Sequence, residues 1–256
     1  MLLKVLILIF FITISIQAKE NKVGLYENQN TYIPTNLEFT NEYNQKTTLK
    51  EIISNTPTIV SFNYFDCPGL CSPQLFSVAS IIDKVQLKPF IDYKIITISI
   101  ESKDSISKAL EKKQTILKTL SQPFPPQTWS FLTSTNQNNI DSITNSVGFK
   151  YEKRVKDGVT DYLHPAMLVV ISPKGKIIRY LNGIDYLPFD LKLALLEAQE
   201  EKARPTIAKT LLYCFAYDAK SKTYVFQAEK VLGSFIFGIV LFFFLYLIKT
   251  GRKKDE

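Results

Sequence analysis

A pair of cysteines at the junction between an apolar run and a helical pattern limits the possible folds of this chain more than any other feature. Residues 58–65, Thr-Ile-Val-Ser-Phe-Asn-Tyr-Phe, predict a buried strand. Residues 75–82 have the apolar periodicity of an amphipathic helix. Cys67 and Cys71 lie between these two segments, in a C-x3-C spacing. We therefore expect both thiols at a turn that joins a strand to a helix.

The position of the two thiols indicates two kinds of chemistry. Residues four apart share one face of a helical turn, so both sulfurs can point the same way. Backbone N–H groups at the start of a helix stabilise negative charge and lower the pKa of a thiol. Such thiols suit reversible disulfide exchange or the capture of a soft metal ion. A structural disulfide and two buried free thiols are the alternatives that the spacing leaves open.

Strands and helices are expected to alternate through the middle of the chain. The expected segments are, in order, a hairpin of 37–39 and 47–49, a helical turn at 50–54, strand 58–65, helix 75–82, strand 93–100, helix 104–120, strand 129–132, helix 139–147, strands 167–171 and 176–181, and helix 188–201. Asp104 is expected to cap its helix, and residues 151–163 are expected to form a polar loop with a turn at residues 157–158. This order, with a thiol pair after the first long strand, predicts a thioredoxin-like α/β fold, with a central β-sheet flanked by helices and a C-terminal β-hairpin and helix.

Both ends of the chain are strongly apolar. Residues 1–18 combine a basic start, a short apolar run and a small residue at Ala18, which is typical of a signal peptide, and an uncleaved anchor is the alternative. Residues 231–248 carry no charge and predict about 27 Å of helix, just enough to cross a bilayer. The basic residues that follow place the C-terminus in the cytoplasm, and hence the globular part across the membrane. A buried core helix is the alternative for residues 231–248.

The expected organisation has six parts. They are the signal peptide 1–18, the N-terminal extension and hairpin 19–56, the thioredoxin-like thiol domain 57–203, the linker segment 204–230, the transmembrane helix 231–248 and the cytoplasmic tail 249–256. The formal net charge is +7, but the lysines of the globular part are scattered. We therefore expect a solvated surface and no nucleic-acid partner.

His164 is the single histidine of the chain, so any site that needs an imidazole must use it. If it lies beside Cys67 and Cys71, two thiolates and one imidazole suit Cu(I), or Cu(II) with added oxygen or water ligands. Zinc in a closed site usually takes a fourth protein ligand, and iron–sulfur clusters usually need four ligands. Spacing alone does not show that His164 is near the thiols. Asp161 could orient its ring, or be a solvated loop carboxylate, and Met167 is expected in the core.

Several motifs together resemble the Sco/SenC family of thioredoxin-like copper proteins, which assist assembly of cytochrome c oxidase. They are Phe62-Asn-Tyr-Phe-Asp-Cys-Pro-Gly-Leu-Cys71, Ser99-Ile-Glu-Ser-Lys-Asp-Ser105, Trp129-Ser-Phe-Leu-Thr133, Val147-Gly-Phe-Lys-Tyr151, His164, Ser172-Pro-Lys-Gly175 and Arg179-Tyr-Leu-Asn-Gly183. By this resemblance Cys67, Cys71 and His164 correspond to the family's copper ligands. Cys214, in the tail, is assigned no metal role.

The resemblance implies a bacterial inner-membrane protein with its globular domain in the periplasm and a C-terminal anchor. Its implied partners are cytochrome c oxidase subunit II, whose dinuclear copper (CuA) centre would receive the copper, a periplasmic copper donor and a thiol reductant. Two alternatives use the same residues. Cys67 and Cys71 could be the redox-active thiols of a thiol–disulfide reductase that keeps the CuA-site cysteines reduced. They could also belong to a peroxiredoxin-like redox protein, which would not need His164.

Overall fold

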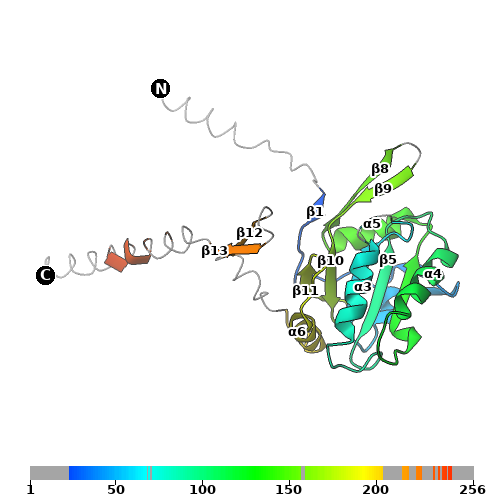
Figure 1. Ribbon diagram of the computed structural model, residues 1–256, viewed down its shortest axis with the longest axis horizontal. Helices are drawn as coiled ribbons and strands as arrows, with labels where there is room; N and C mark the ends of the chain where they lie inside the picture. The colour runs from blue at the N-terminus through cyan, green and yellow to red at the C-terminus, as the bar shows by residue number, and fades with distance from the viewer. Residues whose placement is uncertain are drawn as a thin grey trace, which may run out of the picture. The chain divides into compact units, whose positions relative to one another are not determined.

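The computed structural model describes residues 23–67, 69, 71–156, 159–203, 215–218, 223–226, 233, 236, 238–240 and 242–243. The chain divides into two compact units, Met1–Ala203 and Arg204–Glu256. The first unit contains a β-sheet with helices on both faces (Figure 1). This arrangement confirms the predicted thioredoxin-like α/β fold.

A seven-stranded sheet forms the centre of the first unit, in the order β11-β10-β4-β5-β6-β2-β3. Its strands are β2 (Glu38–Asn41), β3 (Lys46–Thr48), β4 (Thr58–Asn63), β5 (Lys94–Ser99), β6 (Trp129–Thr133), β10 (Met167–Ile171) and β11 (Ile177–Asn182). β4, β5 and β6 run parallel, whereas the remaining neighbours pair antiparallel. The carboxyl ends of β4 and β5 therefore meet at one edge, together with the start of β10.

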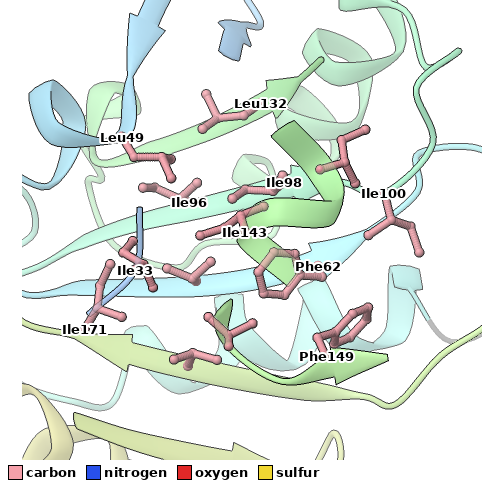
Figure 2. Packing of buried hydrophobic residues seen from close by; sticks show 14 of the residues in the cluster. Ile33, Leu49, Phe62, Ile96, Ile98, Ile100, Leu132, Ile143, Phe149 and Ile171 are labelled. Atoms are coloured by element: carbon pink, nitrogen blue, oxygen red, sulfur yellow. The ribbon is translucent and has the colours of Figure 1, made fainter. Parts of the chain in front are cut away.

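Helices cover the sheet because its strands are apolar on both faces. Along β4, Ile59 belongs to one buried cluster, and Val60 and Phe62 belong to the other. α3 (Cys71–Ile82), α4 (Ile106–Leu117) and α6 (Pro188–Gln199) contribute to the cluster of Ile59. α2 (Leu49–Ile53) and α5 (Gln137–Ser146) contribute to the other cluster, part of which is shown in Figure 2. A short 3-10 turn, η1 (Pro126–Thr128), leads into β6.

The segment 151–163 was predicted to be a loop, and this prediction is wrong. β8 (Glu152–Lys156) and β9 (Val159–Leu163) form an antiparallel hairpin with a sheet of its own. Its polar sequence hid the strands, because the hairpin stands out from the body (Figure 1) and side chains such as Val155 and Leu163 are exposed. The expected turn at residues 157–158 lies outside the described residues.

Two further short strands pair with each other next to α5. β1 (Gly24–Leu25) pairs antiparallel with β7 (Phe149–Lys150). Gly148 precedes β7 with φ +68°, and a Cβ there would lie 1.7 Å from the carbonyl oxygen of Tyr26. Glycine is therefore required, both for its backbone conformation and for the close approach of the two segments.

In the second unit, β12 (Phe215–Asp218) pairs antiparallel with β13 (Thr223–Phe226), within the segment predicted as a linker. Some residues between 233 and 243 are helical, and Ile236, Val240 and Phe242 among them are exposed. In the described part of the chain, no helix has the length and apolar character needed to cross a membrane. The predicted span 231–248 lies largely outside the described residues. The predicted signal peptide 1–18, Cys214 and the tail 249–256 lie wholly outside them.

Candidate functional site

The two cysteines lie at the carboxyl end of β4, in the turn that leads into α3. Cys67 donates its backbone N–H to the carbonyl oxygen of Tyr64 at 3.2 Å, and the N–H of Gly69 donates to the Cys67 sulfur at 3.4 Å. Cys71 is the first residue of α3. Both thiols are free, with Cys67 half-buried and Cys71 buried. The strand-to-helix junction predicted for the thiols is therefore present.

His164 lies beside the cysteine turn because β10 pairs with β4. β9 ends at Leu163 and β10 begins at Met167, so the histidine lies where β10 starts. Since β10 runs antiparallel to β4, its start lies next to the end of β4. The His164 Nε2 atom is 3.6 Å from the Cys71 sulfur. Strand pairing thus creates a proximity that residue spacing could not show.

Hydrogen bonding at the other ring nitrogen orients the imidazole. The Nδ1 atom of His164 lies 3.0 Å from the carbonyl oxygen of Pro165. A carbonyl can only accept, so the neutral ring carries its proton on Nδ1. This tautomer leaves a lone pair on Nε2, on the side of the thiols. The ring is therefore set to donate electrons to an electrophile or metal ion at the sulfurs.

The two thiols differ strongly in acidity. A hydrogen bond from the Cys71 thiol lowers the pKa of Cys67 to about 4, against the effect of burial, with help from the backbone N–H groups of Cys71 and Gly69. The interaction with Cys67, followed by burial, raises the pKa of Cys71. The pair shares one proton, which stays on Cys71 because it is the more buried sulfur. The site therefore combines a half-exposed thiolate with a buried thiol.

Aromatic rings pack beside the histidine. The His164 ring centroid is 5.7 Å from that of Phe149 and 6.4 Å from that of Tyr64, which it meets edge-on. Tyr162 packs on Tyr64 at 5.1 Å and on Tyr151 at 5.8 Å. Rings at these distances limit the positions open to the imidazole.

Asp161 does not hydrogen-bond to the His164 ring, whose two nitrogens lie beside Pro165 and Cys71, and its exposed side chain agrees with the alternative of a solvated carboxylate. Asp161 Oδ1 accepts hydrogen bonds from the Tyr64 hydroxyl at 2.6 Å and from the Tyr162 N–H at 2.8 Å. The hydrogen bond from Tyr64, then that from the Tyr162 backbone, lowers the pKa of Asp161.

Met167 is 1% exposed, which confirms its predicted place in the core.

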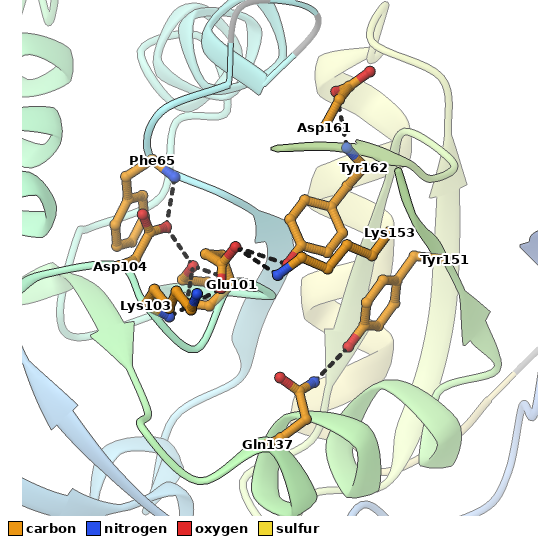
Figure 3. Close-up of polar contacts among 10 residues, drawn as sticks. Phe65, Glu101, Lys103, Asp104, Gln137, Tyr151, Lys153, Asp161 and Tyr162 are labelled. Carbon is orange, nitrogen blue, oxygen red and sulfur yellow. Dashed lines mark hydrogen bonds and ion pairs between the residues drawn. The ribbon is translucent and has the colours of Figure 1, made fainter. Parts of the chain in front are cut away.

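Two acidic residues after β5 support the cysteine turn and the hairpin (Figure 3). Asp104 accepts from the Phe65 N–H at 2.7 Å and from the Ser99 hydroxyl at 2.5 Å. It does not cap α4 as predicted, because the Ser105 side chain accepts the N–H of Lys108 and forms the N-cap.

Glu101 accepts from the Tyr162 hydroxyl at 2.9 Å and pairs with Lys153 of the hairpin at 3.2 Å. Sequence reasoning missed this function of Glu101 and the support that Asp104 gives to the turn. A signal was available in the alternation of strands and helices, because strands joined by a helix usually run parallel and the carboxyl ends of parallel strands share an edge.

Within the described residues, no group of three or more His, Cys, Asp and Glu side chains has the arrangement of a ready-made metal site. The structure brings His164 to Cys71, and Cys71 to Cys67 through their shared proton. The role of the three side chains as metal ligands stays a prediction.

Comparisons with known proteins agree on one family. The SCO1/SenC family profile matches residues 26–188. The SCO1 protein homolog of Bacillus subtilis (strain 168) is 24% identical over 132 residues, a region that covers 52% of this chain and 65% of that protein. The match thus spans slightly less than two thirds of the relative's length.

Solved structures share the fold at low sequence identity. A protein of Aquifex aeolicus VF5 has a TM-score of 0.60 and 21% identity, covering 68% of this chain and 95% of that one. BsSco, described as a member of the Sco family of cytochrome c oxidase assembly proteins with a disulfide switch, has a TM-score of 0.53 and 19% identity over 68% and 98% of the two chains. Arabidopsis thaliana ScoI, solved with copper bound, has a TM-score of 0.52 and 18% identity, covering 64% of this chain and 96% of that one.

Because the family profile spans more than half of the chain, and the fold is that of solved Sco proteins, the chain belongs to the SCO1/SenC family.

Proposed function

We propose that this protein binds copper through Cys67, Cys71 and His164 and delivers it to the CuA centre of cytochrome c oxidase subunit II. The observation that carries the proposal is the 3.6 Å approach of His164 Nε2 to the Cys71 sulfur, and the interaction of Cys71 with the Cys67 thiol adds the second cysteine. Family membership supports it, since one relative was solved with copper bound and another belongs to the cytochrome c oxidase assembly proteins.

The donor set suits copper as the cargo of such a protein. Thiolate sulfur is a soft ligand that favours Cu(I), and imidazole nitrogen suits copper in either oxidation state. Cys67 is already acidic enough to be a thiolate, with a pKa lowered to about 4 mainly by its hydrogen bond from Cys71. Binding copper would require the loss of the proton that Cys71 retains, so uptake would release a proton to solvent.

The unequal exposure of the ligands suggests an order for copper transfer. Cys67 is half-buried, whereas Cys71 is buried at the start of α3. An acceptor thiolate could reach copper from the side of Cys67 and replace that ligand first. Cys71 and His164 would then hold the ion until further acceptor ligands arrive.

We further propose a place for this chemistry in a bacterial inner membrane. The support is the sequence of residues 1–18 and 231–248, with basic residues after the second run. Exposed apolar side chains at Ile236, Val240 and Phe242 agree with a lipid-facing segment. The globular unit would then lie in the periplasm, where a copper donor and a thiol reductant would load and reduce it.

The substitution His164→Ala tests the proposal. Cu(I) affinity should fall sharply, because one of three ligands is lost, whereas thiol–disulfide exchange should continue largely unchanged. Affinity would be measured by competition with a coloured Cu(I) chelator, and exchange by the reduction of a model disulfide. Full copper affinity in the variant would show that His164 is not a ligand.

A thiol–disulfide reductase acting on the CuA-site cysteines is the second candidate, and the acidity difference between the thiols favours it. A half-exposed thiolate at Cys67 can attack a disulfide, and the buried Cys71 can then resolve the mixed disulfide. Two electrons pass to the substrate as the Cys67–Cys71 disulfide forms. If this were the main function, Cys71→Ala would trap mixed disulfides with subunit II, and His164→Ala would leave oxidase assembly intact.

A further inference from the structure

Tyr64 lies between the strand end that carries the cysteines and the hairpin that carries His164. It directly follows β4 and precedes Cys67 by three residues. Its carbonyl oxygen accepts the N–H of Cys67 at 3.2 Å, so it is part of the cysteine turn. Its side chain is buried, with 3% of the residue exposed. The hydroxyl at the far end of the ring is therefore held in one place.

A short hydrogen bond links this hydroxyl to the hairpin. The Tyr64 hydroxyl donates to Asp161 Oδ1 at 2.6 Å. Asp161 belongs to β9 and precedes His164 by three residues. The same Oδ1 atom accepts the N–H of Tyr162 at 2.8 Å, so the carboxylate is itself fixed against the backbone of β9. Hydrogen bonds to a charged acceptor are stronger than those between neutral groups.

The hairpin needs such contacts because backbone pairing does not hold it to the body. Among the described strands, β8 and β9 pair with each other in a separate two-stranded sheet. Side chains attach this hairpin to the body, through Tyr64–Asp161 at one point and through Glu101, which meets Tyr162 and Lys153, at another. Of these contacts, Tyr64–Asp161 is the one that joins the cysteine turn itself to β9, three residues before His164.

We propose that Tyr64 is a positioning residue, whose hydrogen bond to Asp161 keeps the imidazole of His164 beside the two thiols. The inference rests on the proposed copper binding, since it assigns a role in holding one of the proposed ligands. A donor that is already in place binds more tightly, because less conformational freedom is lost when the ion is captured. Removal of the hydroxyl should let the end of β9 move and should weaken copper binding without changing any ligand.

The test compares two tyrosines of the same aromatic cluster. Tyr64→Phe removes one hydroxyl oxygen and keeps the ring that packs on Tyr162. Tyr151→Phe is the matched control, because the Tyr151 hydroxyl also donates to an aspartate, Asp141 of α5, at 3.0 Å. Both variants lose a tyrosine–aspartate hydrogen bond, but only Tyr64 connects the cysteine turn to the strand that leads to His164.

Two measurements on the full chain separate positioning from a general loss of stability. Cu(I) affinity, by chelator competition with reduced protein, should fall about tenfold in Tyr64→Phe and stay at the wild-type value in Tyr151→Phe. Amide hydrogen exchange of the copper-free chain should accelerate at residues 160–164 in Tyr64→Phe alone. Wild-type affinity together with wild-type exchange in Tyr64→Phe would overturn the inference. If the wild-type chain failed to bind copper, the proposed function would fail, and amide hydrogen exchange alone would decide whether Tyr64 holds the end of β9 in place.

A double-mutant cycle tests whether Tyr64 acts through Asp161. Asp161→Ala should weaken copper binding as much as Tyr64→Phe, and the double variant should be no weaker than either single variant. Asp161→Asn keeps an acceptor oxygen and should restore part of the affinity that Asp161→Ala loses. Additive losses in the double variant would show that the two side chains act independently, which contradicts the proposal.

Discussion

The backbone N–H of Phe65 donates a hydrogen bond to the buried carboxylate of Asp104 at 2.7 Å, across the carboxyl ends of the parallel strands β4 and β5. Phe65 precedes Cys67 by two residues, so this contact fixes the start of the cysteine turn. Asp104 also accepts the Ser99 hydroxyl. One carboxylate thus connects the end of β5 to the segment that carries the nucleophilic sulfur.

We predict that Asp104→Ala destabilises the globular unit by about 1–3 kcal/mol, the usual cost of leaving a buried donor without a partner. The Phe65 N–H would lose its acceptor in a position where the residue is 4% exposed. Asp104→Asn is the control, because an amide oxygen can still accept both hydrogen bonds. Denaturant unfolding, followed by the fluorescence of the buried Trp129, measures the difference, and equal stability of the two variants would contradict the prediction.

The pH dependence of stability provides a second test of Asp104. Burial is the largest cause that raises the pKa of this carboxyl above its ordinary value. A raised pKa means that the folded state holds the proton more tightly than the unfolded state, so the associated stability is present at low pH and is lost as the pH rises through the folded-state pKa. The stability of the wild type relative to Asp104→Asn should therefore decrease as the pH rises above the ordinary aspartate range. An increase over that range would mean that hydrogen bonding outweighs burial.

The alkylation rate of Cys67 should report its thiolate form. Its pKa, lowered to about 4 chiefly by the hydrogen bond from Cys71, predicts a rate with iodoacetamide that is constant at neutral pH and halves near pH 4. In Cys71→Ala this donor is absent, and the midpoint should move toward the ordinary thiol value of about 8.5. Mass spectrometry would assign the modified residue. A wild-type midpoint near the ordinary value would show that the two sulfurs do not share a proton.

Two glycines with similar backbone angles should respond differently to alanine. Gly183 has φ +84° and nothing within 4 Å of an added Cβ. Gly183→Ala should therefore lower the free energy of unfolding only by the strain of a left-handed backbone conformation, about 1–2 kcal/mol. Gly148 has φ +68°, and its added Cβ would lie 1.7 Å from the Tyr26 carbonyl oxygen. Gly148→Ala should therefore cost clearly more, because β1 must also separate from β7. Equal losses in unfolding free energy would show that the backbone at Tyr26 can move away from residue 148 without further loss of stability.

Local sequence patterns predicted most of the helices and strands because their apolar spacing is regular. The strand at 58–65, the hairpin around residues 173–175 and the helix at 188–201 are all present, as β4, β10–β11 and α6. The hairpin β8–β9 was missed because its residues are mostly exposed, and no buried face imposes an alternating pattern on the sequence. The role of Asp104 was missed because a carboxylate before a helix is also a common N-cap.

The amino-acid sequence by itself determined that two thiols would stand at a strand-to-helix turn, and that His164 was the single imidazole available to join them. Both facts are local, since they follow from composition and from the periodicity of neighbouring residues. Only the tertiary structure decided that His164 lies at the Cys71 sulfur, that Asp161 binds Tyr64 rather than His164, and that Asp104 holds Phe65. These contacts join residues far apart in the chain, and they depend on which strands become neighbours in the sheet. Strand order is set by the packing of the whole core, which no short segment of sequence contains.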